Sequence, residues 1–365
     1  MNRINSDKNS KLKPPPVLKG WGIFDKKELE DIKKKKLLRH IYAGVSAACD
    51  LHCIYCQTKS GKAMLGEMNL EERKDLLDQA KGLGCQLVHI AARGEPTVDP
   101  LFLRQLQYIH KLGMIPVIFT HGGNIDNKWT DYLWENDASV IIKIHSFQPE
   151  LQDWFAGVKD YTKRRNRGLR ILIEKGFNKT VPTRLGADIL VMKKNYKEIE
   201  KIFRWCRENN VFPLVKPFLC NERGRSKFVM KNLYLPPLKI KELYYKLAEI
   251  DRRDYGYYWE PTPPYAGINC NYYLYHIVVT IMGDVWPCIG LSHLCLGNIR
   301  EKSLKECWES ETMEKIRNIF QHIKGICQTC EKFKKEICYG CPCRRTYLQG
   351  PKKTFICRSC WEDNM

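Results

Sequence analysis

The sequence predicts an α/β fold in which helices cover a parallel sheet. From residue 41 onward, short runs rich in β-branched and aromatic residues alternate with amphipathic stretches, the pattern of repeated strand–helix units. The alternation stops near residue 255, where the chain becomes rich in aromatic residues and proline and then in cysteine. We therefore expect a polar, basic lead-in over 1–40, an α/β domain over 41–255 and a cysteine-rich domain over 256–365.

The elements of the α/β domain are expected in a regular order after a basic helix at 26–38. Asn69 and Glu72 form a capping-box pattern at the start of the first helix between strands, and Gly113 is expected to end the second. The predicted strands are 41–47, 86–92, 115–120, 139–145, 184–192 and 211–217. The predicted helices are 69–82, 99–113, 127–135, 165–175, 195–209 and 236–252, with one more at 303–320.

The composition points to a protein that binds metal through reduced thiols. The chain has 365 residues and 17 cysteines, 14 of which fall within 49–56 and 270–360. It has no run of roughly 18 apolar residues that would span a bilayer, and its first residues are too polar for a secretory signal. We expect a cytoplasmic protein that does not enter membranes, where clustered cysteines favour metal ligation over disulfides.

The net charge of +20 would suit nucleic acid or an acidic partner. The sequence carries no recognised signature of a nucleic-acid-binding fold. A nucleic-acid partner is therefore not expected, and a zinc-ribbon nucleic-acid-binding protein is kept as a remote alternative.

The first predicted strand is followed by a loop with three closely spaced cysteines, Cys49, Cys53 and Cys56. Ligands bind at the carboxyl ends of strands in parallel α/β folds, so this loop is a candidate site. A structural zinc ion needs four ligands, and His52 is poorly placed as the fourth because it is adjacent to Cys53. A [4Fe–4S] cluster can be held by three thiolates that leave one iron open. Zinc and unliganded core cysteines remain the alternatives.

This cysteine spacing, with Tyr55 before the third cysteine, resembles the signature of the radical S-adenosylmethionine (radical SAM) enzymes. The resemblance covers residues 41–220 and implies a six-stranded partial (β/α)6 barrel. It also implies that S-adenosylmethionine chelates the open iron and is cleaved reductively to a 5′-deoxyadenosyl radical. An iron–sulfur oxidoreductase or maturase of this kind would need an electron donor such as flavodoxin or ferredoxin.

The next strand ends carry further features of this family. Gly94, Glu95 and Pro96 resemble its Gly-Gly-Glu-Pro turn, with Arg93 in place of the first glycine, and the resemblance implies contact with the ammonium group of the cofactor. Thr120 or His121 is the candidate contact for its nucleoside. The alternatives without a cofactor contact are an exposed turn after the second strand and a Gly-Gly turn that forms for backbone reasons alone.

Two more candidate regions follow. Lys143 and His145 lie on the same face of the fourth strand, and one of them is a candidate for the cofactor ribose. Arg164 or Arg167 is a candidate for its carboxylate. A solvent-facing strand end and a solvated helix start are the alternatives.

The C-terminal cysteines resemble the SPASM extension of radical SAM enzymes. On their own, three Cys-x2-Cys pairs would suggest zinc ribbons. The cysteine, the Gly-x4-Cys hairpin and the cysteine-rich end together resemble SPASM, which implies two auxiliary [4Fe–4S] clusters; one cluster or zinc remain alternatives. The candidate ligands are Cys270, Cys288, Cys327, Cys330, Cys338, Cys341, Cys343, Cys357 and Cys360. Two clusters require eight thiolates, so one of Cys341, Cys343, Cys357 and Cys360 would not be needed as a ligand.

The expected function is therefore hydrogen abstraction from a substrate carbon by a radical SAM/SPASM enzyme, in peptide or protein modification. The alternative is dehydrogenation or epimerisation of a small metabolite or aminosugar. Residues 1–40 are too short for the leader-recognition domain of many peptide-modifying relatives. Either a separate leader-binding protein presents the peptide, or the substrate is a small molecule.

Overall fold

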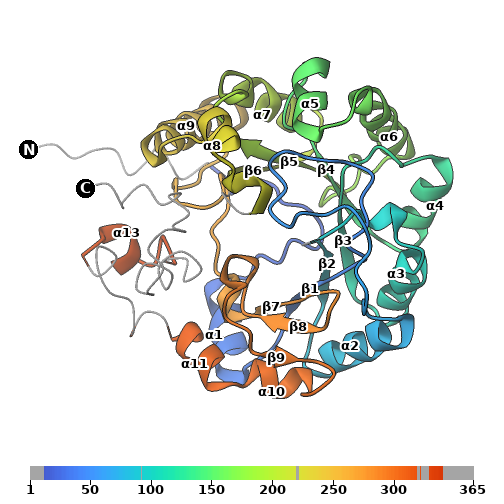
Figure 1. The fold of residues 1–365 in the computed structure, drawn as a ribbon. Helices are drawn as coiled ribbons and strands as arrows, with labels where there is room; N and C mark the ends of the chain where they lie inside the picture. The colour runs from blue at the N-terminus through green and yellow to red at the C-terminus, as the bar shows by residue number, and fades with distance from the viewer. Residues whose placement is uncertain (1–11, 92, 219–221, 319–320, 322–328, 340–365) are drawn as a thin grey trace, which may run out of the picture.

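A curved parallel sheet surrounded by helices forms the centre of the molecule (Figure 1). The computed structural model describes residues 12–91, 93–218, 222–318, 321 and 329–339. All six predicted strands are present and pair in parallel in chain order. They are β1 (His40–Ala43), β2 (Leu87–Ile90), β3 (Ile115–Thr120), β4 (Ser139–Lys143), β5 (Leu185–Val191) and β6 (Phe212–Pro217). The expected α/β class is thus confirmed, and among the described residues β6 is the last strand on its side of the sheet, so the barrel is partial.

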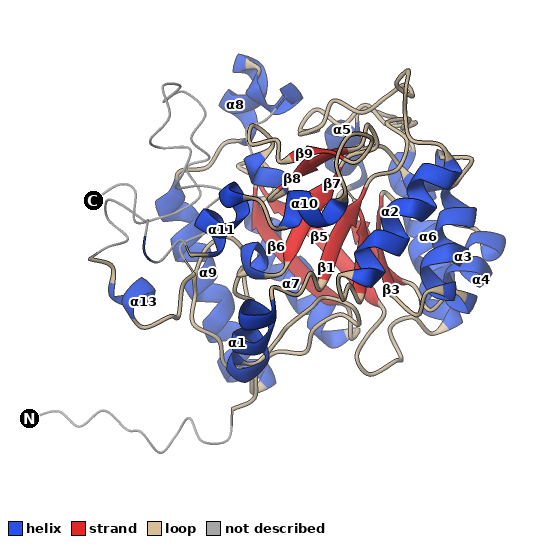
Figure 2. Cartoon of the chain, turned by 90° about the horizontal axis from the view of Figure 1, so that it is seen from below, coloured by secondary structure: helices blue, strands red, loops and turns tan. Residues whose placement is uncertain are grey.

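Helices follow the strands and cover the outer face of the sheet (Figures 1 and 2). They are α2 (Leu70–Gly82), α3 (Phe102–Lys111), α4 (Asn127–Glu135), α5 (Pro149–Ala156), α6 (Tyr161–Lys175), α7 (Ile199–Glu208) and α9 (Pro237–Ile250). A further helix, α8 (Lys227–Leu233), lies beyond the end of the strands (Figure 2). The predicted capping box begins α2, where Asn69 accepts a hydrogen bond from the Glu72 backbone and the Glu72 side chain accepts one from the Asn69 backbone. The sequence did not predict α5 or α8.

The region after residue 255 continues the same sheet. Strand β7 (His276–Val279) lies parallel to β1, with His276 opposite His40 and Val278 opposite Tyr42. Antiparallel strands β8 (Asp284–Trp286) and β9 (Gly297–Asn298) complete a nine-stranded sheet in the order β6-β5-β4-β3-β2-β1-β7-β8-β9. The cysteine-rich region therefore joins the α/β domain through backbone hydrogen bonds.

The helix predicted at 303–320 is instead two short helices. They are α10 (Leu304–Trp308) and α11 (Glu311–Arg317). The break falls where the Ser310 side chain accepts a hydrogen bond from the backbone of Met313 and so starts a new helix. A further helix, α13 (Glu331–Lys334), lies near the end of the described chain.

The lead-in contributes to the core as well as to the surface. After residue 12 it includes α1 (Lys26–Lys35) and the buried Trp21, which is 2% exposed. The Trp21 ring packs in the sheet interior against the rings of His89, Phe119, Phe212, Tyr265 and Tyr272. This segment therefore closes the interior of the curved sheet, which its polar composition did not predict.

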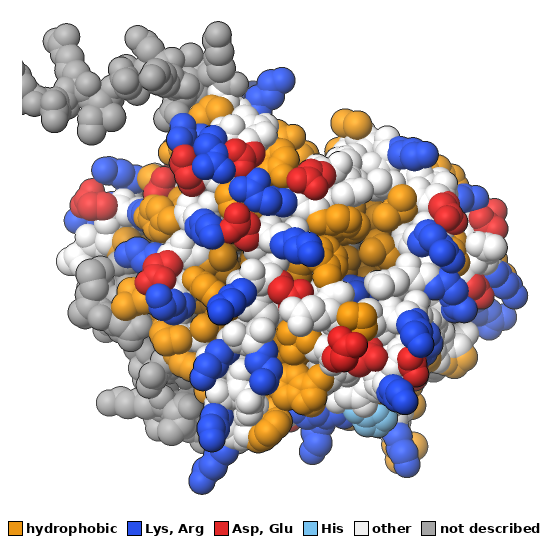
Figure 3. Space-filling model, turned by 90° about the horizontal axis from the view of Figure 1, so that it is seen from above, with side chains coloured by type: hydrophobic (Ala, Val, Ile, Leu, Met, Phe, Trp, Pro, Cys, Tyr) orange, Lys and Arg blue, Asp and Glu red, His pale blue; other side chains and the backbone are white. Residues whose placement is uncertain are grey.

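On the face shown in Figure 3, charged side chains do not gather in one patch. Lys and Arg side chains are spread over that face among acidic and apolar ones, without forming one basic stripe. Within the described residues, no helix combines the length and the apolar character that crossing a bilayer would require.

Candidate cofactor site

The three cysteines of the first loop face one cavity. Cys49, Cys53 and Cys56 lie between β1 and α2 and line a cavity whose other walls come mostly from residues on or after β2–β6, together with Tyr265 and Ile289. Cys53 is buried, and the other two are partly buried. Parallel strands present their carboxyl ends at the same edge of the sheet, which explains why distant segments meet here.

The thiols of Cys49 and Cys56 have different pKa values because their surroundings differ. Burial raises the pKa of Cys49 to about 12. Burial also opposes ionisation of Cys56, but hydrogen bonds with Thr58 and with the backbone at Thr58 and Ser60, together with the charge of Lys143, lower the pKa of Cys56 to about 7. Three thiols on one wall of an open cavity suit a three-thiolate iron–sulfur cluster with one free position.

His52 does not supply the fourth ligand that a zinc site in the cysteine loop would need. His52 is exposed and lies outside the cavity lining. Ligand atoms of Cys49, Asp50 and His121 lie within 4.8 Å of one another. However, His121 Nε2 and Asp50 Oδ1 are already hydrogen-bonded at 2.7 Å, and this contact holds the pKa of Asp50 well below its usual range.

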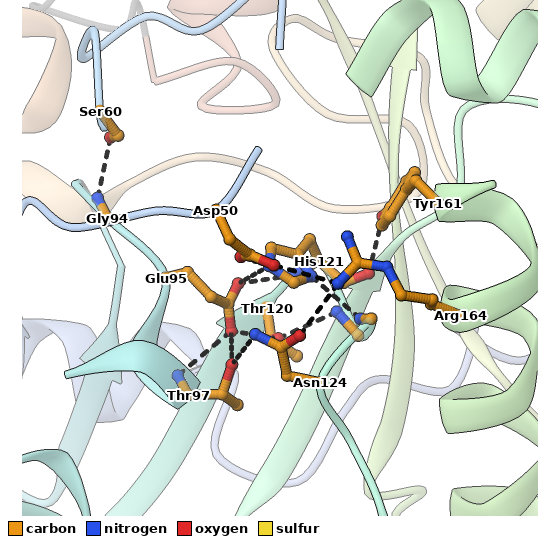
Figure 4. Close-up of polar contacts among 12 residues, drawn as sticks. Asp50, Ser60, Gly94, Glu95, Thr97, Thr120, His121, Asn124, Tyr161 and Arg164 are labelled. Atoms are coloured by element: carbon orange, nitrogen blue, oxygen red, sulfur yellow. Dashed lines mark hydrogen bonds and ion pairs between the residues drawn. The ribbon is translucent and has the colours of Figure 1, made fainter. Parts of the chain in front are cut away.

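Glu95 organises a hydrogen-bond network behind the cysteine loop (Figure 4). Its side chain is buried, and it accepts hydrogen bonds from Thr120 Oγ1 at 2.6 Å and from the His121 backbone at 2.9 Å. Gly94 and Pro96, on either side, line the cavity, whereas the Glu95 side chain does not. The structure therefore brings the predicted Glu95, Thr120 and His121 together, with the carboxylate engaged by the protein itself.

The Asp50 carboxylate ties this network to α6. Arg164 Nη1 donates to Asp50 Oδ2 at 3.1 Å and to Asn124 Oδ1 at 3.3 Å (Figure 4). Arg164 is therefore engaged in holding the cysteine loop, and it does not line the cavity. Arg167 is exposed on α6 and also lies outside the lining.

The two candidates on the fourth strand have different positions. Lys143 lines the cavity beside the cysteines. His145 is fully buried behind it; its Nε2 lies 2.8 Å from the Tyr55 hydroxyl and its Nδ1 accepts from the Leu190 backbone. Burial lowers the pKa of His145 to about 3. His145 thus supports Tyr55, which does line the cavity, and lies outside the lining itself.

Several cavity residues were missed by the sequence analysis. Asp188 on β5 and Lys216 on β6 line it, with Lys216 Nζ 2.9 Å from Asp188 Oδ1. Burial opposes ionisation of Asp188, but Lys216 and the other nearby cations keep its pKa below the usual range. A charged residue inside an otherwise apolar strand was the signal available for both, in "LGADILV" and "FPLVKP".

The candidate auxiliary ligands are only partly within the described residues. Cys270, Cys288, Cys330 and Cys338 are partly buried. Cys270 and Cys288 flank the β7–β8 hairpin, and Ile289, next to Cys288, lines the cavity. Cys327, Cys341, Cys343, Cys357 and Cys360 lie outside the described residues, so their pairing into clusters stays a prediction.

Two curated relatives resemble most of the chain. An AdoMet-dependent heme synthase of Methanosarcina barkeri is 25% identical over 336 residues, which cover 84% of this chain and 91% of the relative. The mycofactocin maturase MftC of Mycolicibacterium smegmatis is 24% identical over 308 residues, covering 80% of this chain and 75% of the relative.

Solved structures share the fold. SuiB of Streptococcus suis, bound to the precursor peptide SuiA, has a TM-score of 0.65 at 16% identity and covers 90% of this chain and 77% of that one. The anSMEcpe structure with bound AdoMet has a TM-score of 0.62 at 18% identity, covering 88% of this chain and 93% of that one.

Two family models match separate parts of the chain. Residues 44–206 match the radical SAM superfamily, and residues 270–342 match the SPASM iron–sulfur cluster-binding domain. The first match runs from the cysteine loop into α7, and the second includes β7, which pairs with β1, together with β8 and β9. The chain is therefore an enzyme of the radical SAM superfamily with a SPASM domain, which implies a [4Fe–4S] cluster, S-adenosylmethionine and auxiliary iron–sulfur clusters as its cofactors.

Proposed function

We propose that this enzyme abstracts a hydrogen atom from a carbon of a peptide or protein substrate. The observation that carries the proposal is the single cavity in which three thiols face Lys143, Asp188 and Lys216. When bound there, the reduced cluster and S-adenosylmethionine supply a 5′-deoxyadenosyl radical that removes the hydrogen. The protein's part is to hold the cofactors, orient the substrate and exclude water from the cavity.

The roles of individual residues follow from their positions. Cys49, Cys53 and Cys56 would hold the cluster. Tyr55, Gly94 and Pro96 line the cavity and would contact the cofactor, and Lys143 lines the same cavity beside the cysteines. Glu95, Thr120, His121, His145 and Arg164 would act behind that layer by fixing the loops and strand ends, and we assign no cofactor contact to Arg167.

The peptide assignment draws on what similar proteins are described as doing. SuiB is described as bound to a precursor peptide, and MftC is named a maturase. A leader-binding partner and an electron donor of the flavodoxin or ferredoxin class complete this proposal.

The second candidate is modification of a small molecule. It is favoured by the heme synthase from M. barkeri, which is similar over 84% of this chain. A panel of candidate precursor peptides and metabolites, analysed by mass spectrometry for a change in mass, separates the two.

The test of the proposed chemistry is anaerobic reconstitution with iron and sulfide. We expect broad visible absorbance and formation of 5′-deoxyadenosine after addition of reductant and S-adenosylmethionine. Cys53→Ala should lose that product and part of the iron. Cys206→Ala, which changes a buried cysteine of α7 outside the cavity, is the matched control and should keep both. Stoichiometric zinc in place of iron, with Cys53→Ala unchanged, would refute the proposal.

A further inference from the structure

The cavity has a wall of charged side chains opposite the cysteine loop. Lys143, Asp188 and Lys216 come from the neighbouring strands β4, β5 and β6, and all three line the cavity. Lys143 and Asp188 are directly opposite in the strand register. Lys216 Nζ lies 2.9 Å from Asp188 Oδ1 and 5.7 Å from the centre of the Phe119 ring. The wall is therefore a row of cation, anion and cation beside an aromatic ring.

Asp188 cannot neutralise both lysines. Its ion contact is with Lys216, and the Asp188 side chain is 7% exposed. The Lys143 ammonium makes no hydrogen bond or ion pair with any residue that the structure describes, although it lies in the cavity. An ammonium group held away from water without a partner is costly. One positive charge of this row is thus left for a ligand.

The other cations at the cavity have structural partners. Arg223 donates to the backbone oxygen of Ser60 at 2.6 Å and holds the cysteine loop. Arg93 contacts the sulfur of Met64. Among the described residues that line the cavity, Asp188 is the only acidic one, so these arginines do not relieve the surplus.

The cofactors would not remove the surplus either. The negative charge that thiolates bring to an iron–sulfur cluster is opposed by the net positive charge of S-adenosylmethionine, whose sulfonium and ammonium outweigh its one carboxylate. With the cluster oxidised, as in the experiment below, cofactor binding would leave the total charge of the cavity nearly unchanged. The positive charge left on the row, to which Arg93 and Arg223 add, complements an anionic group on the substrate.

Resting on the proposed function, we propose that the substrate carries a carboxylate that binds to Lys216 and Lys143 around Asp188. A carboxylate accepts hydrogen bonds from two ammonium groups and supplies the single negative charge that the row lacks. The aromatic side chains of Tyr42, Phe119 and Tyr265, which line the same cavity, would contact the adjacent apolar part of the substrate. Lys216 is thereby a specificity-determining residue.

The experiment uses the reconstituted holoenzyme with S-adenosylmethionine and without reductant, so that no turnover occurs. The probes are 3-phenylpropionate and 3-phenylpropionamide, which have similar shape and differ in charge. Binding of each is measured by calorimetry or ligand-observed NMR. We expect wild type to bind the carboxylate at least tenfold more tightly, and Lys216→Met to lose that preference.

Further variants separate charge from folding. Lys216→Arg should keep the preference. Asp188→Asn should strengthen carboxylate binding about tenfold, because it increases the positive surplus, whereas a purely structural Asp188 would give no such gain. If Lys216→Met folds poorly because Asp188 loses its partner, Lys216→Met/Asp188→Asn removes both charges and leaves the surplus positive charge on Lys143. This variant should regain part of the preference, and its failure to do so would contradict the charge argument. Lys239→Met, an exposed lysine of α9 paired with Glu242, is the control and should behave as wild type.

Two outcomes overturn the inference. Equal wild-type affinity for carboxylate and amide would show that no carboxylate subsite exists. A tenfold loss of S-adenosylmethionine affinity in Lys216→Met, with the probe preference intact, would assign the lysine to the cofactor carboxylate. Formation of 5′-deoxyadenosine in a separate reduced sample tests the proposed function alone, so failure of one is distinguishable from failure of the other.

Discussion

A Cβ atom placed on Gly94 would lie 1.8 Å from the carbonyl oxygen of Ser46. The turn after β2 therefore packs directly against the chain that leads into the cysteine loop. This approach is reinforced by the hydrogen bond from the Glu95 backbone to the Ala48 carbonyl at 2.8 Å. Gly94 also has a φ of +73°, so both space and backbone conformation require glycine there.

Gly94→Ala should disrupt this contact between the two loops. We expect a loss of about 3 kcal/mol or more in unfolding free energy, since backbone strain and overpacking add, and a lower iron content after reconstitution. Denaturant unfolding and iron analysis measure both. Gly82→Ala is the control, because a Cβ at this helical position meets nothing within 4 Å; a similar loss in both variants would contradict the prediction.

Arg73→Met should destabilise the entry to the cysteine loop. Arg73 Nη1 lies 2.7 Å from Asp99 Oδ2, which also accepts a hydrogen bond from the Ser46 backbone at 2.8 Å. Removing the arginine leaves a buried carboxylate without its cation, at a cost of about 3–5 kcal/mol in unfolding free energy. Lys74→Met removes a surface pair with Glu71 and a cation–π contact with Tyr108, and it should change stability by less than about 1 kcal/mol. Equal effects in urea unfolding would count against this role of Arg73.

Glu95→Gln should weaken the network behind the cavity while leaving the cysteines in place. The carboxylate accepts from Thr120 and His121 through different oxygens, and an amide group turns one acceptor into a donor. We expect a loss of about 1–3 kcal/mol in unfolding free energy, a retained cluster and weaker binding of S-adenosylmethionine through the displaced turn. Equilibrium dialysis measures the affinity. Glu71→Gln on the exposed face of α2 is the control, and unchanged stability and affinity in Glu95→Gln would remove this residue from the site.

Stability should fall as the pH decreases from 6.5 toward 4 because of the buried histidines. Burial lowers the pKa of His89 to about 4 and the pKa of His40 and His276 well below the usual value. These groups are neutral in the fold but bind protons in the unfolded chain below pH 6.5, so unfolding takes up protons and is favoured by acid. Each contributes up to about 1.4 kcal/mol per pH unit in this window.

The His89 contribution is measurable by a difference between variants. His89→Gln should reduce the slope of unfolding free energy against pH between 6.5 and 4, because glutamine does not titrate there. His110→Gln replaces an exposed histidine of α3 and should keep the wild-type slope. A wild-type slope in His89→Gln would show that His89 is not held neutral.

The parts of the fold that were predicted from sequence depend on local patterns. The six strands and the Asn69 capping box are encoded by neighbouring residues, and the cysteine spacing identified the loop after β1. The pairing of β7 with β1 joins segments far apart in the chain, so no local pattern encodes it. The same is true of Trp21, whose partners lie on several strands.

The site was predicted in outline and missed in its side-chain detail. Lys143 lies in the cavity as expected, but His145, two residues on, is enclosed because Tyr55 and the Leu190 backbone occupy both of its nitrogens. Arg164 or Arg167 was the candidate for the cofactor carboxylate, and the structure shows Arg164 hydrogen-bonded to Asp50. The hydrogen-bond partner of a polar side chain depends on the tertiary packing around it, which a local sequence pattern does not predict.

The parallel pairing of β1 with β7 limits how the enzyme can open. β1 leads into the cysteine loop, and its backbone hydrogen bonds to β7 bring the SPASM strands alongside it. Moving the β7–β8 hairpin away from the cysteine loop would break the hydrogen bonds between β1 and β7 and expose the edge of β1. A hinge between the two parts of the sheet would therefore cost these hydrogen bonds, and we expect the β1–β7 pairing to hold the cysteine loop and the β7–β8 hairpin at one spacing.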